Sequence, residues 1–138
     1  MAPEDVCELF AAFGTVTVRR MFGGAGIYAE ETMFALVHDG VIYLKADAQS
    51  APDFERENLA PFTYTTRGGK RGVMSYRRMP DRLYDDPDEL AVWAREALAA
   101  ARRGAANAKK KAKEKKNRIT VRVEKASYFE ETIQEVKP

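Results

Sequence analysis

The 138-residue sequence has a single cysteine and a single histidine, and each scarcity excludes a class of protein. One cysteine cannot build an internal disulfide framework or a cysteine-cluster zinc site. One histidine argues against a histidine-rich metal site, so we expect no metal and no other cofactor. No apolar run approaches the roughly 20 residues that a membrane helix needs, and the acidic N-terminus does not fit a signal peptide. We therefore expect a soluble cytoplasmic protein without membrane contact.

The residues that are plentiful favour one folded domain followed by a charged extension. Hydrophobic residues make up 45% of the chain and aromatic residues 10%, which excludes a wholly disordered protein. Residues 1–103 carry 13 basic and 16 acidic residues, whereas residues 104–118 carry seven basic residues and one acidic residue. We therefore predict a domain over residues 1–103, a Lys-rich linker over residues 104–118, and a short C-terminal extension over residues 119–138.

The pattern of apolar residues predicts an α+β fold. Strand-like alternation and helix-like spacing follow one another in the order helix, four strands, helix, two strands, helix. The dipeptide Asp39-Gly40 is typical of a tight hairpin turn, because both central positions of such a turn need positive φ. Hairpins imply antiparallel pairing, so we expect a two-layer sandwich with the helices on one face of an antiparallel sheet. Trp93 lies on the apolar stripe of the last helix, and we expect it to be buried in the core.

The C-terminal segments give weaker patterns. Residues 105–116 contain only Ala, Asn, Lys and Glu, so they either extend the last helix or remain mobile because their like charges repel. Ile119, Val121 and Val123 alternate with polar residues, which predicts a strand, and a short amphipathic helix is expected after it. Twenty residues cannot bury a core alone, so this extension must dock on the domain or a partner, or stay mobile.

Several motifs in series resemble the N-terminal domain of the TfoX/Sxy family. They match in order and spacing over residues 3–103 and comprise the segments 20–28 (RMFGGAGIY), 33–37 (MFALV) with Asp39-Gly40, 43–47 (YLKAD), 61–64 (PFTY), 74–76 (MSY) and Trp93. The resemblance implies a fold similar to secretion chaperones. It also implies kinship with regulators of DNA uptake competence, which work with the cyclic-AMP receptor protein at certain promoters. The full-length regulators carry a second, helical domain, and a lysine tract stands in its place here.

Residues with catalytic potential have simpler explanations in this sequence. His38 has no second histidine, serine or cysteine paired with it, so a structural role is favoured over proton transfer. Cys7 lies among acidic residues that oppose a thiolate. Gly23, Gly24 and Gly26 precede a strand rather than a helix, which favours a turn over a phosphate loop. We therefore predict that the protein is not an enzyme.

The basic residues are the candidate binding residues, for nucleic acid or for an acidic partner protein. Lysines and arginines near aromatic residues can bind phosphates, and a lysine run can do so without sequence specificity. A solvated strand face and a solubilising tail are the alternatives. The candidates are Arg19, Arg20, Arg67, Lys70, Arg71, Arg77, Arg78, Lys109, Lys110, Lys111, Lys113, Lys115 and Lys116.

Two functions remain open from the sequence. The first is a non-enzymatic regulatory or adaptor domain that acts through protein contacts in transcription regulation, as the resemblance implies. The second is nonspecific nucleic-acid binding through the Lys-rich tract and the arginine-bearing strands. A protein partner is expected under the first, and assembly as a homodimer is left open.

Overall fold

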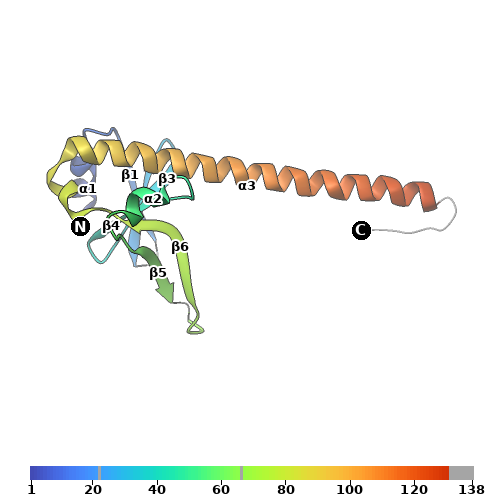
Figure 1. Cartoon of the computed structure of the whole chain (residues 1–138), viewed down its shortest axis with the longest axis horizontal. Helices are drawn as coiled ribbons and strands as arrows, with labels where there is room; N and C mark the ends of the chain where they lie inside the picture. Colours follow the sequence, from blue (N-terminus) through green and yellow to red (C-terminus); the bar gives the residue numbers. More distant parts are fainter. Residues whose placement is uncertain (22, 66, 131–138) are drawn as a thin grey trace. The chain divides into compact units, whose positions relative to one another are not determined.

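The computed structural model describes residues 1–21, 23–65 and 67–130, and it has the α+β architecture that the sequence predicts (Figure 1). Six antiparallel strands form one sheet, and helices pack against it. The elements are α1 (Pro3–Leu9), β1 (Thr17–Met21), β2 (Gly24–Ala29), β3 (Thr32–His38), β4 (Val41–Lys45), α2 (Ala51–Glu55), β5 (Pro61–Thr65), β6 (Arg71–Arg78), the short 3-10 helix η1 (Asp81–Asp85) and α3 (Pro87–Glu130).

The chain divides into two compact units, Met1–Arg103 and Gly104–Pro138. The strand expected at residues 119–123 is wrong, because these residues lie within α3. Three alternating apolar residues are a short pattern, and Ile119 and Val123 are also four residues apart, which suits a helix equally well. Residues 104–118 are also helical, and their role as a linker stays a prediction. The short helix expected near the C-terminus falls partly on residues 131–138, which lie outside the described residues. Across the described residues, no helix is both long and apolar enough to cross a membrane.

The strand order in the sheet is β1-β2-β3-β4-β6-β5. The first four strands form a meander, and the β5–β6 hairpin joins it through three residue pairs, Tyr43↔Arg78, Leu44↔Arg77 and Lys45↔Tyr76. The predicted tight turn between β3 and β4 is confirmed, since Asp39 and Gly40 have φ values of 51° and 73°. The turn between β2 and β3 is also left-handed but uses two glutamates instead of glycine, Glu30 and Glu31.

One hydrophobic core lies between the sheet and the helices. Helix α1 contributes Val6, and α3 contributes Leu90 and Ala94, all at most 1% exposed. Strand β4 meets them with the alternate residues Ile42 and Leu44, because side chains along a strand point to opposite faces. Strand β3 contributes the adjacent residues Phe34 and Ala35, where its register with β2 shifts. The strand residues in this core include Ile27, Ala35, Val37, Ile42 and Leu44.

Trp93 differs from the prediction, because it is half-buried at the edge of the core. Its ring packs edge-on against Phe54 of α2 at 5.1 Å between ring centres. Its indole N–H donates to Glu89 Oε2 at 3.3 Å. A tryptophan with one polar atom to satisfy is placed at such a boundary more readily than in the middle of an apolar core.

Gly24 is required by a close approach of two strands. A Cβ atom built on Gly24 would collide with the carbonyl oxygen of Val37 on β3. The neighbouring Gly23 has open space around it but a φ of +76°, a conformation that residues with a side chain rarely adopt. The positive φ in this turn thus belongs to Gly23, and Gly24 has a steric role.

Gly24→Ala is expected to destabilise the domain by about 2–3 kcal/mol, because the added methyl group must push β2 away from β3. Gly23→Ala is the control that isolates backbone strain, and we expect a loss of about 1 kcal/mol from it. Urea unfolding of both variants measures the difference. Equal losses would show that the strand contact has room to relax.

An ion pair fastens the segment before α2 to the end of the first unit. Arg103 donates to both carboxylate oxygens of Asp47, with Nε–Oδ2 at 2.7 Å and Nη2–Oδ1 at 3.1 Å. Asp47 also accepts hydrogen bonds from the backbone N–H groups of Gln49 and Ser50. Mainly because of Arg103, and opposed by partial burial, the pKa of Asp47 falls from its ordinary 3.8 to about 2.

Asp47 should therefore make folding stability depend on pH in the acid range. A carboxyl with a lowered pKa in the folded state stabilises above its unfolded pKa, and this contribution is lost as the pH falls from about 4 to about 2. We expect Asp47→Asn to cost about 1 kcal/mol at pH 7, after allowance for solvent screening, and less below pH 4. Asp81→Asn, which removes the exposed pair with Arg78, is the control. Chemical denaturation at several pH values tests this, and a pH-independent difference would contradict it.

Candidate functional site

The sheet separates the candidate arginines onto two faces. Adjacent residues on a strand point in opposite directions, so Arg19 and Arg20 on β1 do not share a surface. Arg19 lies over the ring of Tyr28 at 4.6 Å and is 3.9 Å from a carboxylate oxygen of Glu31. The pairing of β4 with β6 likewise places Arg77 beside the core residue Leu44, one position away from Arg78. The arginines on the strands therefore do not form one cationic surface.

Arg77 and Arg78 are each engaged by groups of the same chain. Arg77 donates to the carbonyl oxygen of Leu59 at 3.1 Å and approaches Glu55 at 3.4 Å. Arg78 pairs with Asp81 at 3.4 Å. These contacts attach β6 to α2 and η1, which gives both arginines a structural task.

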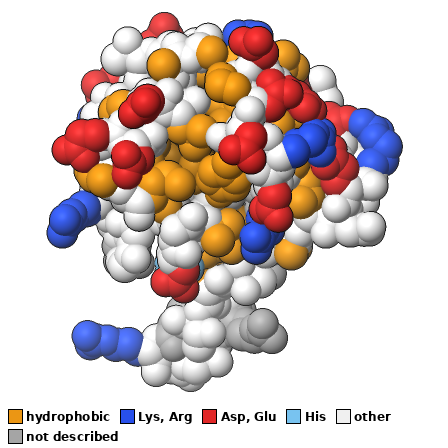
Figure 2. All heavy atoms as spheres, turned by 90° about the vertical axis from the view of Figure 1, so that its left-hand side faces the viewer, with side chains coloured by type: hydrophobic (Ala, Val, Ile, Leu, Met, Phe, Trp, Pro, Cys, Tyr) orange, Lys and Arg blue, Asp and Glu red, His pale blue; other side chains and the backbone are white. Residues whose placement is uncertain are grey.

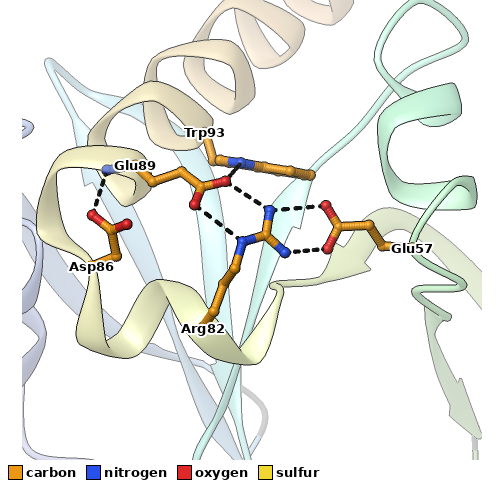
Figure 3. Close-up of polar contacts among 5 residues, drawn as sticks. All are labelled: Glu57, Arg82, Asp86, Glu89 and Trp93. Carbon is orange, nitrogen blue, oxygen red and sulfur yellow. Dashed lines mark hydrogen bonds and ion pairs between the residues drawn. The ribbon is translucent and has the colours of Figure 1, made fainter.

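Arg82, on η1, joins three segments of the first unit (Figure 3). Its guanidinium contacts both carboxylate oxygens of Glu57 at 2.5 and 3.0 Å and both of Glu89 at 3.1 and 2.7 Å. These hydrogen bonds lower the pKa of Glu57 and of Glu89. Glu89 also accepts from Trp93, and its backbone N–H donates to Asp86 at the start of α3. This Arg82 cluster (Glu57, Arg82, Glu89) therefore fixes the turn after α2, η1 and α3 together.

The remaining candidates lie on the β5–β6 hairpin and on α3. Arg67 and Lys70 are exposed on the hairpin, and Arg71 begins β6. On α3 the side chains of Lys109, Lys110, Lys111 and Lys113 are exposed, and Lys115 and Lys116 lie further along the same helix. The two sets belong to different units of the chain. Of all the candidates, the lysines of α3 are the densest group of exposed cations.

A groove with a volume of about 970 Å³ lies beneath the β5–β6 hairpin in the first unit. We call it the hairpin groove. Strands β1, β2 and β3 form one wall, and β5 and β6 form the other. Its lining residues are Met21, Gly24, Ala25, Leu36, Val37, His38, Phe62, Thr63, Tyr64, Thr65, Arg67 and Met74.

Aromatic contacts hold the hairpin over the sheet. Phe62 packs edge-on against His38 at 5.3 Å and against Tyr43 at 4.9 Å, measured between ring centres. Tyr64 lies over Gly72 on β6, where any side chain would collide with its ring. Leu36 is only 4% exposed although it faces away from the core. The groove floor is therefore apolar and preformed.

The groove offers little for acid–base or metal chemistry. His38 is 39% exposed, and its Nε2 lies 3.4 Å from the exposed carboxylate of Asp39, which follows it in the chain. Cys7 is on α1, where its thiol donates to the carbonyl of Val16, and it does not line the groove. In the described part of the chain, no group of three or more His, Cys, Asp or Glu side chains could hold a metal ion.

A space-filling view of the left-hand side of Figure 1 shows a second surface feature (Figure 2). Apolar side chains gather at the centre of this face, and carboxylate side chains surround much of them. The prevalence of acidic groups agrees with the excess of acidic residues over residues 1–103. This face therefore lacks the dense positive charge that binding to a nucleic-acid backbone needs.

The hairpin groove was not predicted from the sequence. Two signals pointed toward it. Residues 33–37 are a continuous apolar run, which is typical of a strand covered on both faces. Gly72 pairs across the hairpin with Tyr64, and a glycine opposite an aromatic residue leaves room for its ring. Neither signal identifies the element that packs on the second face of this strand.

Comparison with known proteins gives two matches. The TfoX N-terminal domain family matches residues 8–101. The protein Sxy of Escherichia coli (strain K12) is 31% identical over 94 residues, which cover 68% of this chain and 44% of Sxy. The chain thus matches less than half the length of this relative.

Because the sequence has one tryptophan, its fluorescence can report on the Arg82 cluster. In Arg82→Gln, Glu57 and Glu89 lose their shared cation and repel each other, so α2 should move away from α3 and expose Trp93. We expect a red shift of the emission maximum and a fall in the unfolding temperature by several degrees. Arg78→Gln, which breaks an exposed pair elsewhere, should leave the emission maximum unchanged and lower the unfolding temperature less. An unshifted spectrum for Arg82→Gln would contradict the role of the cluster.

Proposed function

The chain belongs to the TfoX N-terminal domain family, and we propose from this that it is a non-enzymatic regulatory domain acting through protein contacts in transcription regulation. Family membership and the identity to Sxy support a TfoX/Sxy-like regulatory role. The hairpin groove is the observation that supports protein contact in particular. It is preformed, largely apolar, and lined by no acid–base pair or metal cluster among the described residues.

The part of the relative that the chain matches limits this proposal to one domain. The chain covers 44% of Sxy, and the TfoX N-terminal domain family matches residues 8–101 of the chain. Beyond it, residues 104–130 are helical and begin with the Lys-rich tract. We therefore propose that this domain supplies a regulatory contact, and that competence regulation with the cyclic-AMP receptor protein is the first process in which to test it.

Nucleic-acid binding is the second candidate function, and the lysines of α3 favour it. Lys109, Lys110, Lys111 and Lys113 are all exposed, so they can approach phosphates without breaking internal contacts. The arginines on the strands support it less, since Arg77 and Arg78 are already paired with carboxylates. Binding of this kind would be nonspecific, because lysine acts as a point charge.

A capture experiment with the whole chain separates the two functions. The tagged chain is incubated with native cell extract, with and without nuclease, and bound proteins are identified by mass spectrometry. We expect at least one protein of the transcription apparatus to remain after nuclease treatment. We also expect the variant with glutamine at Lys109, Lys110, Lys111 and Lys113 to retain that protein. Loss of every partner on nuclease treatment would reject the protein-contact function in favour of nucleic-acid binding.

Salt dependence then tests the second function directly. If the lysines bind phosphates, affinity for a random-sequence DNA duplex should fall steeply with salt, with a log–log slope of about −0.9 for each phosphate contacted. The four-glutamine variant should flatten that slope by about 3 to 4, whereas Arg78→Gln should leave it unchanged. Absence of binding at low salt would exclude this function.

A further inference from the structure

The two edges of the sheet are protected to different degrees. Strands β1 and β5 each have a neighbour on one side only. The exposed arginines Arg19 and Arg20 stand in the middle of β1, and such charges discourage pairing with another strand. Strand β5 has the sequence PFTYT and carries no charge. Its protections are Pro61 and a register shift between Pro61 and Thr63, both at its start, and the threonines and aromatic residue that follow favour strand pairing.

The unprotected strand is also a wall of the hairpin groove. Four consecutive residues of β5, Phe62 to Thr65, line the groove. Because consecutive side chains of a strand point to opposite faces, this continuous lining means that the main-chain edge of β5 borders the groove as well. An occupant therefore meets backbone N–H and C=O groups that β6 does not pair, beside an apolar floor formed by residues such as Leu36 and Met74.

The charge of the groove indicates the chemistry of its occupant. Among the lining residues the ionisable side chains are His38, Arg67 and Tyr64, and none is Asp or Glu. Arg67 is exposed at the hairpin, and it forms no ion pair with the described residues. An acidic group on the occupant would complement Arg67, while apolar groups would cover the floor.

We propose that β5 and the hairpin groove bind an extended segment of a partner protein, with alternating acidic and apolar residues, that adds to the sheet as a seventh strand. Strand addition satisfies the main-chain groups of β5, and the alternation directs apolar side chains to the floor and acidic ones toward Arg67. This proposal rests on the protein-contact function proposed above and names the chemistry of the partner.

The observations favour this occupant over two others. A compact apolar molecule would fill the floor but leave the edge of β5 without hydrogen-bond partners. A second copy of the chain pairing through β5 would bring together two uncharged strands, neither of which offers a carboxylate to Arg67. An extended segment with acidic and apolar residues can pair with the main chain of β5, cover the apolar floor and place a carboxylate near Arg67.

The test is a selection from a random 12-residue peptide library displayed on phage, with the full chain as bait. We expect the enriched peptides to alternate acidic and apolar residues. A synthetic copy of the most enriched peptide should bind the chain in fluorescence anisotropy, and hydrogen exchange should show slower exchange of β5 amides when it is bound. Protection of backbone amides distinguishes strand addition from contact through side chains alone.

Matched charge reversals test the role of Arg67. We expect Arg67→Glu to weaken binding of the selected peptide at least tenfold, and a copy of the peptide with lysine at its acidic positions to recover binding to that variant. Arg95→Glu changes the net charge equally on the exposed surface of α3, away from the groove, and should alter affinity less than twofold. Circular dichroism and thermal melts confirm that both variants fold.

Three outcomes would overturn the proposal. These are a selection without enrichment, peptide binding that leaves the β5 amides unprotected, and dimerisation of the chain through β5 in analytical ultracentrifugation. Failure of the proposed function is separate, because it appears as nuclease-sensitive partners in the capture experiment. Nuclease-resistant partners together with a failed selection would reject only strand addition at β5.

Discussion

The burial of β3 on both faces is the constraint on which the rest of this domain depends. Residues Phe34 to Val37 are all nearly inaccessible to solvent, so the strand needs an apolar cover on each side. The helices supply one cover and form the core. On the other face Phe62 packs over the strand end at His38, and the hairpin that carries it encloses the groove. The groove thus forms because the β5–β6 hairpin covers the face of β3 that the helices leave open.

Charge in this domain is used mainly to hold segments together. Arg82 and Arg103 each bind two carboxylates and connect the segments that flank α2 with later parts of the chain. Such pairs between partly exposed groups contribute modestly one by one, but they set the position of short elements that have few apolar residues. Arg67, in contrast, lies on the hairpin and lines the groove.

Local patterns allowed much of the fold to be predicted, and contacts distant in sequence accounted for what was missed. The six strands and the turn at Asp39-Gly40 follow from alternation and turn chemistry, which involve neighbouring residues. The pairs of Arg82 with Glu57 and of Arg103 with Asp47 join residues 25 and 56 positions apart, and no local pattern announces them. Alternation already separates Arg19 from Arg20, so the sequence contained the reason that these two do not share a surface. The groove requires knowing how the hairpin curls, which depends on packing of the whole sheet.

The joint between the hairpin and the meander has a consequence for how the domain opens. Three residue pairs connect β4 with β6, and backbone hydrogen bonds from Ala46 to Ser75 and from Met79 to Ile42 extend this joint at its two ends. The pairs within the meander and within the hairpin join strands that are adjacent in sequence. Two cooperative folding units are therefore expected, each built from local contacts and joined late along a short seam. Opening of that seam costs less than global unfolding, because each unit keeps its own ladder. The wall of the groove is thus the part of the sheet that can separate while the core beneath the helices stays folded.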